Sequence, residues 1–484
     1  MKRRKHSPAK SRRGRSEQAS HSDQSPVEPS RYYFHAFRAV IAAGIVIRVV
    51  VFVHMGYFNN DDHLSVLEYV SRYWLPPHAA QFNQAYHPPL YYFLAALFFR
   101  WGNLPAVQGL SLLLSIASLM IIARLLRQLA WVNERIKPWC LALPAFHPQF
   151  IMFSLFISND TLAIFLGALI FYQCRRVQIT PSFSNHFLLA IGLGLGLLTK
   201  AVFLVFVAPL LLFIWMTGRR QARPAPRLLL RLASVFAIAS LLGSYKYVEN
   251  FILFGSPTVS NLDFWQWTAE QRPTWIGVRS LFDVNILKLV RDPVVSTSTV
   301  HSYPLMIYGS FWYSLIPEST FHGNLIAPFN RLGSMIYLAA LGPSFLMAVG
   351  ASRVGMATIR WGFRTTTERN PSQQNRIIYE STLLLTFLLN FFLIISVGWS
   401  YDVWSVFQGR LFFPSYFALI LALSAGMEWA ESSRLKSNVF RCFMLALIVF
   451  FLAYIIIEIW LAVLYPVNPL SMNHMPYQID MNAR

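Results

Sequence analysis

Long apolar runs occupy most of the chain, and they restrict its fold more than any other feature. A helix needs about 20 apolar residues to cross the hydrocarbon core of a bilayer. Windows that meet this requirement lie near 37–55, 106–124, 137–154, 159–174, 228–246, 334–352, 379–398, 410–428 and 442–465. The sequence is 55% hydrophobic and only 13% charged, which excludes a water-soluble globule with a polar surface. We therefore predict an all-α polytopic membrane protein.

Two further stretches decide the number of spans. Residues 186–217 are long enough for two spans, divided at Thr199-Lys200, because a charge at mid-membrane depth is costly. This places Lys200 at a membrane face and predicts about eleven transmembrane helices. Residues 87–101 are also apolar, but a crossing there would move the basic connections that follow to the outer side. We expect this segment to lie flat on the outer face.

The basic residues set the orientation of the chain. A formal net charge of +20 would suggest a nucleic-acid partner in a soluble protein. Here the Lys and Arg residues fall in the N-terminal tail and in short connections between spans, so no nucleic-acid partner is expected. These connections lie at 124–137, 175–176, 219–231, 353–376 and 434–441. Because basic connections face the cytosol, the N-terminus is predicted in the cytosol and the C-terminus outside.

This topology divides the chain into five parts. They are a disordered basic cytosolic tail, an N-terminal transmembrane module that contains the first outer loop at 56–105, a second outer loop, the C-terminal transmembrane helices and an outer tail. Their boundaries are 1–35, 36–246, 247–333, 334–465 and 466–484. The basic tail is also suited to contact with anionic membrane lipids.

The first outer loop is predicted to contain interfacial helices. In the segment 63–74, four apolar residues recur at helical spacing, so one face can contact the membrane surface. They are Leu64, Leu67, Val70 and Trp74. Pro88-Pro89 is expected to begin a second helix, because proline is accepted in a first helical turn.

An acidic pair, Asp61-Asp62, directly follows the first span in the segment YFNNDDHLSVLEY. A solvated loop is one interpretation of this pair. The topology, however, places Asp160, Lys200 and Arg410 at the same outer face, on the ends of other spans. Carboxylates and cations that meet at one membrane face can line a shared polar cleft.

These segments together resemble the integral-membrane glycosyltransferases with the C-type fold, which include protein O-mannosyltransferases and the aminoarabinose transferases of bacterial lipid A. The resemblance rests on the acidic pair and on HPPLYYFLAALF (87–98), FHPQFIMFSLFISNDTLAIFLGALIFY (146–172), GLGLLTKAVFLVFVAPLLL (194–212) and QGRLFFPSYFALILAL (408–423). The acidic pair in this family is commonly Asp-Glu, whereas this chain has Asp-Asp. Glutamate reaches one methylene further, so the departure concerns Asp62 more than Asp61.

The resemblance implies transfer of a sugar from a polyprenyl- or dolichyl-phosphate carrier to a glycan, lipid or protein acceptor on the periplasmic or luminal side, with inversion. Asp61 is the candidate base that takes the proton of the acceptor hydroxyl, with Asp62 beside it. Asp160 is the candidate for a second carboxylate position. Lys200, Arg410 and His87 are the candidates for stabilising the leaving phosphate.

His63 adjoins the acidic pair and is assigned to substrate binding. With Asp61 and Asp62 it also offers donors to a divalent metal, but three adjacent ligands cannot surround a cation unaided. No cofactor is firmly implied, and a divalent metal remains an alternative. The three cysteines have no metal-ligand spacing.

Each candidate also has a purely structural interpretation. Lys200 and Arg410 can snorkel at helix ends, and Asp160 can cap the helix that follows it. The sequon Asn159-Asp160-Thr161 is expected to be inaccessible at the membrane surface. Most of the aromatic residues in and after the second outer loop are expected to anchor it to headgroups, with one or two contacting sugar. These are Trp265, Trp267, Trp275, Phe311, Trp312 and Tyr313.

Two other functions remain open from the sequence. A transporter or flippase of lipid-linked sugars would place ionisable groups near the middle of its spans, where only Arg48 and Glu458 lie here. An inactive assembly subunit would be compatible with the altered acidic pair. A bacterial inner membrane is favoured over that of the endoplasmic reticulum, because no retrieval signal and no accessible sequon are found.

Overall fold

The computed structural model describes residues 31–55, 62–264, 278–293, 300–313, 326–363, 370–401, 403 and 406–464, and their regular structure is helical. The long helices are α1 (Arg31–Met55), α3 (Leu90–Gln128), α6 (Asn159–Ile179), α7 (Phe183–Leu197), α8 (Leu204–Arg220), α9 (Ala225–Gly243), α13 (Ile326–Phe363), α14 (Pro371–Tyr401), α15 (Tyr416–Ala430) and α16 (Arg434–Leu464). Shorter helices are α2 (His63–Tyr73), α4 (Lys137–Phe146), α5 (Pro148–Met152), α10 (Tyr245–Phe254), α11 (Leu287–Arg291) and α12 (Tyr303–Trp312). The 3₁₀ segments η1 (Ala201–Phe203), η2 (Asn261–Asp263), η4 (Val278–Leu281) and η9 (Gly409–Ser415) complete the order.

Among the described residues, nine helices are long and apolar enough to cross a membrane, so the chain is an all-α, multi-pass membrane protein. The predicted count of about eleven is not confirmed, and two predicted spans account for the difference. The segment 186–198 appears as α7, which has 15 residues and is short for a span. The segment 137–154 is divided into α4 and α5.

The break between α4 and α5 also explains why a charged residue, Arg48, lies inside the span formed by α1. Pro148 has no N–H, so the carbonyl of Pro144 has no intrahelical donor. Arg48 of α1 supplies the missing donors, since its guanidinium donates to Pro144 O at 2.8 Å, to Ala145 O at 3.1 Å and to Ser115 Oγ at 2.9 Å. A fully buried arginine therefore stabilises a helix end, and no substrate path is needed to explain it.

The apolar segment 87–101 forms the first part of α3. The helix begins at Leu90, after Pro88-Pro89 as predicted, and non-helical dihedral angles at Gly102 and Asn103 separate this part from the predicted span. Asn103 has φ 57° and ψ −154°, a positive-φ conformation outside the helical regions, which interrupts the helix at this point. The two predicted helices are thus the two arms of one kinked helix.

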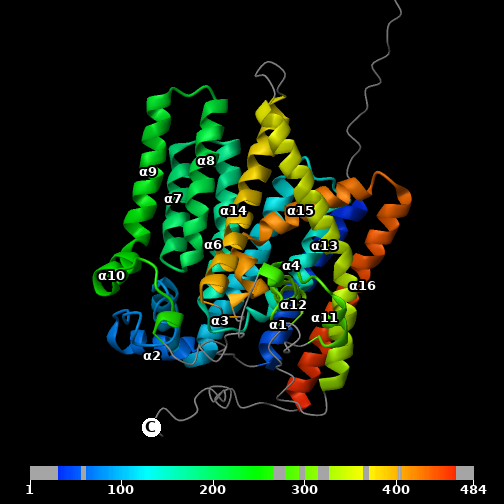
Figure 1. The fold of residues 1–484 in the computed structure, drawn as a ribbon, viewed down its shortest axis with the longest axis horizontal. Coiled ribbons are helices and arrows are strands. Elements are labelled where there is room, and N and C mark those ends of the chain that lie inside the picture. The colour runs from blue at the N-terminus through cyan, green and yellow to red at the C-terminus, as the bar shows by residue number, and fades with distance from the viewer. Residues whose placement is uncertain are drawn as a thin grey trace, which may run out of the picture.

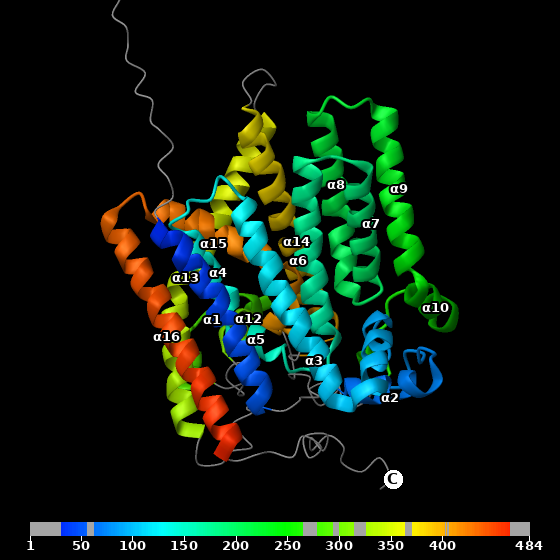
Figure 2. The same ribbon diagram turned by 180° about the vertical axis from the view of Figure 1, so that it is seen from behind.

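The two ends of the helix bundle differ in what they contain (Figures 1 and 2). The start of α1, the end of α3 and the α8–α9 turn lie at one end, which we call the inner end. The end of α1, α2, α10 and the end of α16 lie at the opposite end, called the outer end. The described parts of the basic connections lie together at the inner end, as predicted, and the assignment of this end to the cytosol stays a prediction.

Helix α2 forms as predicted, but its apolar face does not lie on a surface. Leu64, Leu67 and Val70 are buried against the rest of the protein, and α2 packs on α3. Trp74 is instead the left-handed C-cap residue of α2 and is 38% exposed. The first outer loop is therefore part of the packed structure at the outer end, where it covers the helix ends.

Candidate functional site

A buried ion pair lies at the outer end, where the first turn of α6 meets the turn between α7 and η1. The Lys200 ammonium donates to the Asp160 carboxylate, and both residues are buried, at 9% and 3% exposure. A lysine that snorkels at a helix end would direct its charge to water. The structural interpretation of Lys200 as a snorkelling residue is therefore wrong.

The residues around Asp160 explain why its carboxylate is free to face Lys200. Ser158 caps α6 by accepting a hydrogen bond from the Asp160 N–H at 3.2 Å, so the interpretation of Asp160 as the N-cap is wrong. The Ser158 hydroxyl also donates to Asp160 Oδ2 at 3.2 Å. Asn159 is fully buried and donates to Thr199 O at 3.4 Å, which agrees with an inaccessible sequon.

His63, at the start of α2, extends this network. Its Nε2 lies 3.2 Å from Ser158 Oγ, and its Nδ1 lies 2.7 Å from the hydroxyl of Tyr92 in α3. A continuous hydrogen-bonded chain therefore runs from Tyr92 through His63 and Ser158 to Asp160. Such a chain fixes the orientation of the carboxylate and offers a path for a proton.

His87 and Arg410 complete the polar cluster. The His87 ring stacks on His63 with centroids 5.9 Å apart, and its Nδ1 is buried without a hydrogen-bond partner among the described residues. Arg410, half-buried in η9, lies close enough for its charge to act on both Asp160 and His87. We call this group the outer polar cluster; its members are His63, His87, Ser158, Asp160, Lys200 and Arg410.

The segment that carries Arg410 is held by close backbone packing. The N–H of Gly409 donates to Ser310 Oγ at 2.7 Å, and Asn390 donates to Leu411 O at 2.9 Å. On the other side, Gly167 of α6 packs directly against the backbone of Pro414, which leaves no room for a Cβ. Arg410 is thus positioned against the same helix that carries Asp160.

We expect Gly167→Ala to destabilise the protein by about 1–3 kcal/mol and to reduce activity, because the new methyl group overlaps the Pro414 carbonyl. The backbone of η9 would have to move, and Arg410 with it. Chemical denaturation in detergent measures the loss of stability. Gly192→Ala is the control, since its Cβ would meet Ile170 Cγ1 at 3.4 Å, an ordinary contact. Equal stability of the two variants would contradict the role of this contact.

Asp61 lies outside the described residues, and Asp62 is described. Asp62 has φ 56° and precedes α2, and its carboxylate accepts a hydrogen bond from Ser65 Oγ at 2.7 Å. Burial raises the pKa of the Asp62 carboxyl, and the bonds from Ser65 oppose that rise. Within the described part of the chain, Asp62 has no hydrogen bond or ion pair with the outer polar cluster.

Of the six aromatic residues predicted to contact headgroups or sugar, the structure describes three. Trp265, Trp267 and Trp275 lie outside the described residues. The other three are 2–6% exposed and pack in the core rather than on the surface. They are Phe311, Trp312 and Tyr313. The Trp312 Nε1 donates to Ser344 Oγ at 3.0 Å, and the ring of Phe311 packs at 5.1 Å from that of His147.

The described residues contain no group of three or more His, Cys, Asp and Glu side chains that would hold a metal ion. The metal alternative involved Asp61, which lies outside them.

Two members of the hydrogen-bonded chain from Tyr92 to Asp160 were not predicted, Ser158 and Tyr92. The position of Ser158 directly before the α6 sequence is an N-cap signal that was available in the sequence.

Stability is expected to fall below pH 6.5 because of His87. Burial and the charges of Lys200, His63, Arg410 and Lys246 hold the pKa of His87 well below its usual value of 6.5. Below pH 6.5 the unfolded chain binds a proton that the folded chain does not, so the free energy of unfolding falls by about 1.4 kcal/mol per pH unit. Above pH 6.5 this contribution is absent.

Denaturation at pH 7.5 and pH 5.5 tests this expectation, with His87→Gln predicted to reduce the difference between the two conditions. His78→Gln, which changes an exposed histidine in the same loop, is the matched control. The assignment to His87 is wrong if His87→Gln retains the full pH dependence of the unchanged protein.

No protein-family model matches the chain, and no curated protein sequence matches it. Similar solved structures include ArnT from Cupriavidus metallidurans, bound to undecaprenyl phosphate and in the apo state. They are 12% and 13% identical to this chain, cover 83% and 81% of it and 79% and 78% of their own chains, and align with TM-scores of 0.37 and 0.36. Similarity at this level does not transfer a function to this chain.

Proposed function

We propose that the protein transfers a sugar from a polyprenyl- or dolichyl-phosphate carrier to an acceptor at the outer end of the bundle. The observation that supports this most is the meeting of two cations in the outer polar cluster. Lys200 pairs with the buried Asp160 carboxylate, and the charge of Arg410 acts on the same carboxylate. Cations that lie together in a largely buried setting can bind an anionic ligand, and a phosphate fits this requirement.

The leaving group of such a transfer is the lipid phosphate. Its negative charge grows as the bond between the anomeric carbon and the phosphate oxygen breaks. Lys200 and Arg410 would then stabilise the transition state more than the bound donor, which is the requirement for catalysis. Arg410 can donate to two phosphate oxygens at once, whereas Lys200 supplies a point charge.

The acceptor hydroxyl must lose its proton as it attacks the anomeric carbon. Asp61, in the segment that joins α1 to α2, is the proposed base, and attack opposite the phosphate gives inversion. Asp160 holds Lys200 in place, and the chain from Tyr92 through His63 and Ser158 fixes the carboxylate. Asp160 is in this account a positioning residue rather than the base.

The experiment has two stages. Mass spectrometry of lipid extracts and surface glycans from a deletion strain identifies the carrier lipid that accumulates and the glycan that is lost. The purified protein is then reconstituted in liposomes with that carrier lipid and its acceptor. Release of free polyprenyl phosphate, in equal amount to the glycosylated acceptor, is the expected result. Movement of intact donor across the membrane without cleavage would contradict the proposal and indicate a flippase.

A further inference from the structure

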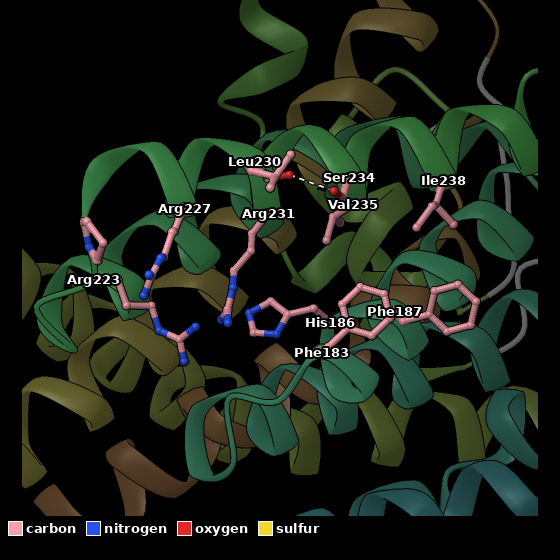
Figure 3. A pocket seen from close by; sticks show the side chains of 11 residues that line it. Phe183, His186, Phe187, Arg223, Arg227, Leu230, Arg231, Ser234, Val235 and Ile238 are labelled. Carbon is pink, nitrogen blue, oxygen red and sulfur yellow. Dashed lines mark hydrogen bonds between the residues drawn. The ribbon is translucent and has the colours of Figure 1, made fainter.

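A separate pocket lies at the inner end of the bundle, between α7 and α9 (Figure 3). Its volume is about 400 Å³, within the range of small-molecule sites. It lies at the start of both helices, whereas the outer polar cluster lies beyond the end of α7. None of its lining residues belongs to that cluster.

The shape of the pocket follows from how α7 and α9 pack. Near their outer ends the helices are in close contact, since a Cβ on Gly194 would lie 2.8 Å from Leu242 Cβ and 3.1 Å from Ala239 O. Gly243 likewise packs directly on Leu197. Among the described residues, no such glycine contact joins α7 to α9 near their starts, and the pocket opens between the larger side chains there.

The lining of the pocket changes from basic to apolar along α9. Arg227, Arg231, Val235 and Ile238 share one face of the helix, at spacings of three and four residues. At a rise of about 1.5 Å per residue, the stripe extends about 16 Å from the inner end into the bundle. Figure 3 shows the arginines on one side of the pocket and the apolar side chains on the other.

The facing helix, α7, shows the same change from basic to apolar residues. His186 is buried and lies opposite Arg231, and Phe187 faces the apolar part (Figure 3). Phe183 at the rim is 76% exposed, so the pocket opens to the surface of the bundle. Arg227 and Arg231 have no hydrogen bond or ion pair with any described residue. Arg227 and Arg231 therefore have no anionic partner among the described residues, and the apolar part of the pocket begins directly beside them.

Arg223 has a different role at the same pocket. Its guanidinium donates to Pro181 O at 3.0 Å and to Gln221 Oε1 at 2.8 Å. These bonds join the α8–α9 turn to the turn before α7. The inner rim of the pocket is thereby fixed, which leaves Arg227 and Arg231 to bind a ligand.

We infer that this pocket binds an anionic glycerophospholipid of the leaflet at the inner end. The phosphate would contact Arg227 and Arg231, and an acyl chain would lie along Phe187, Val235 and Ile238. Arginine favours phosphate oxygens because its planar fork donates two hydrogen bonds. The cytosolic leaflet is rich in anionic lipid, and the predicted orientation places the pocket there. The inference does not depend on the proposed transferase activity.

The full-length protein in detergent, titrated with lipid and examined by native mass spectrometry, tests the inference. The probes are dioleoyl phosphatidylglycerol and dioleoyl phosphatidylcholine, which carry identical chains. Arg227→Gln/Arg231→Gln is expected to weaken phosphatidylglycerol binding by about 10- to 30-fold, and to leave phosphatidylcholine binding unchanged. Ser234→Trp, which fills the pocket and leaves the charge unchanged, is expected to weaken phosphatidylglycerol binding as well.

Arg353→Gln/Arg360→Gln is the matched control, because it removes two exposed arginines from the inner part of α13. It should retain the affinity of the unchanged protein for phosphatidylglycerol. An equal loss in this control would overturn the inference and indicate general surface attraction. Displacement of the lipid by inorganic phosphate at the same concentration would also overturn it, because a soluble anion would then suffice. Sugar transfer is measured separately, so failure here leaves the proposed function unaffected.

Discussion

Lys200→Met is expected to lower the free energy of unfolding by about 3–5 kcal/mol and to abolish sugar transfer. The substitution leaves the Asp160 carboxylate buried without its charge partner, which is the costly way to break such a pair. It also removes one of two cations proposed to bind the donor phosphate. Chemical denaturation in detergent and the reconstituted transfer assay measure the two effects.

The double variant Asp160→Asn/Lys200→Gln separates stability from activity. It removes both charges, so most of the lost stability should return, whereas transfer should remain absent because the phosphate still lacks its cation. Lys288→Gln is the control, since its pair with Asp283 is about one third exposed and contributes at most about 1 kcal/mol. Recovery of transfer in the double variant would show that Lys200 has only a structural role.

Asp61→Asn is expected to reduce turnover by about 10²- to 10⁴-fold, the usual contribution of a general base. The amide retains the size of the side chain but cannot accept the acceptor's proton. Folding should be unaffected, as judged by the unfolding midpoint. A single-turnover measurement, in which the donor-bound enzyme is in excess over the acceptor, separates this step from the affinity for the donor.

Asp62→Asn provides the comparison within the acidic pair. Its carboxylate is engaged with Ser65 at the start of α2, so a much smaller loss is expected. A larger loss for Asp62→Asn than for Asp61→Asn would reverse the assignment. Full turnover by Asp61→Asn would refute a base at that position.

Much of the fold was predictable because bilayer thickness and backbone hydrogen bonding leave few choices to an apolar chain. The helix starts at Leu90 and Asn159 follow local signals, proline and an N-cap serine. The break of the segment 137–154 was not predicted, although Pro148 is a local signal for it. What no local pattern contains is the stabilisation of this break by Arg48, which lies about 100 residues away in sequence.

The candidate site could also be predicted only in part. Topology alone brings Asp160, Lys200 and Arg410 to one end, because each lies at the end of an apolar segment. Their partners were harder to predict, since the hydrogen bond of Tyr92 to His63 depends on the fold of the first loop. The buried ring of Trp312 was predicted at a surface because composition does not distinguish interfacial from core aromatic residues.

The outer polar cluster is proposed to hold the phosphate of a lipid carrier. Photo-crosslinking with a polyprenyl phosphate that carries a diazirine on its first isoprene unit, followed by peptide mapping, tests it most directly. Crosslinks to peptides that contain Asp160, Lys200 or Arg410 are expected, as is their loss in Lys200→Met/Arg410→Gln. Crosslinks confined to the inner end, or unchanged in that variant, would contradict it.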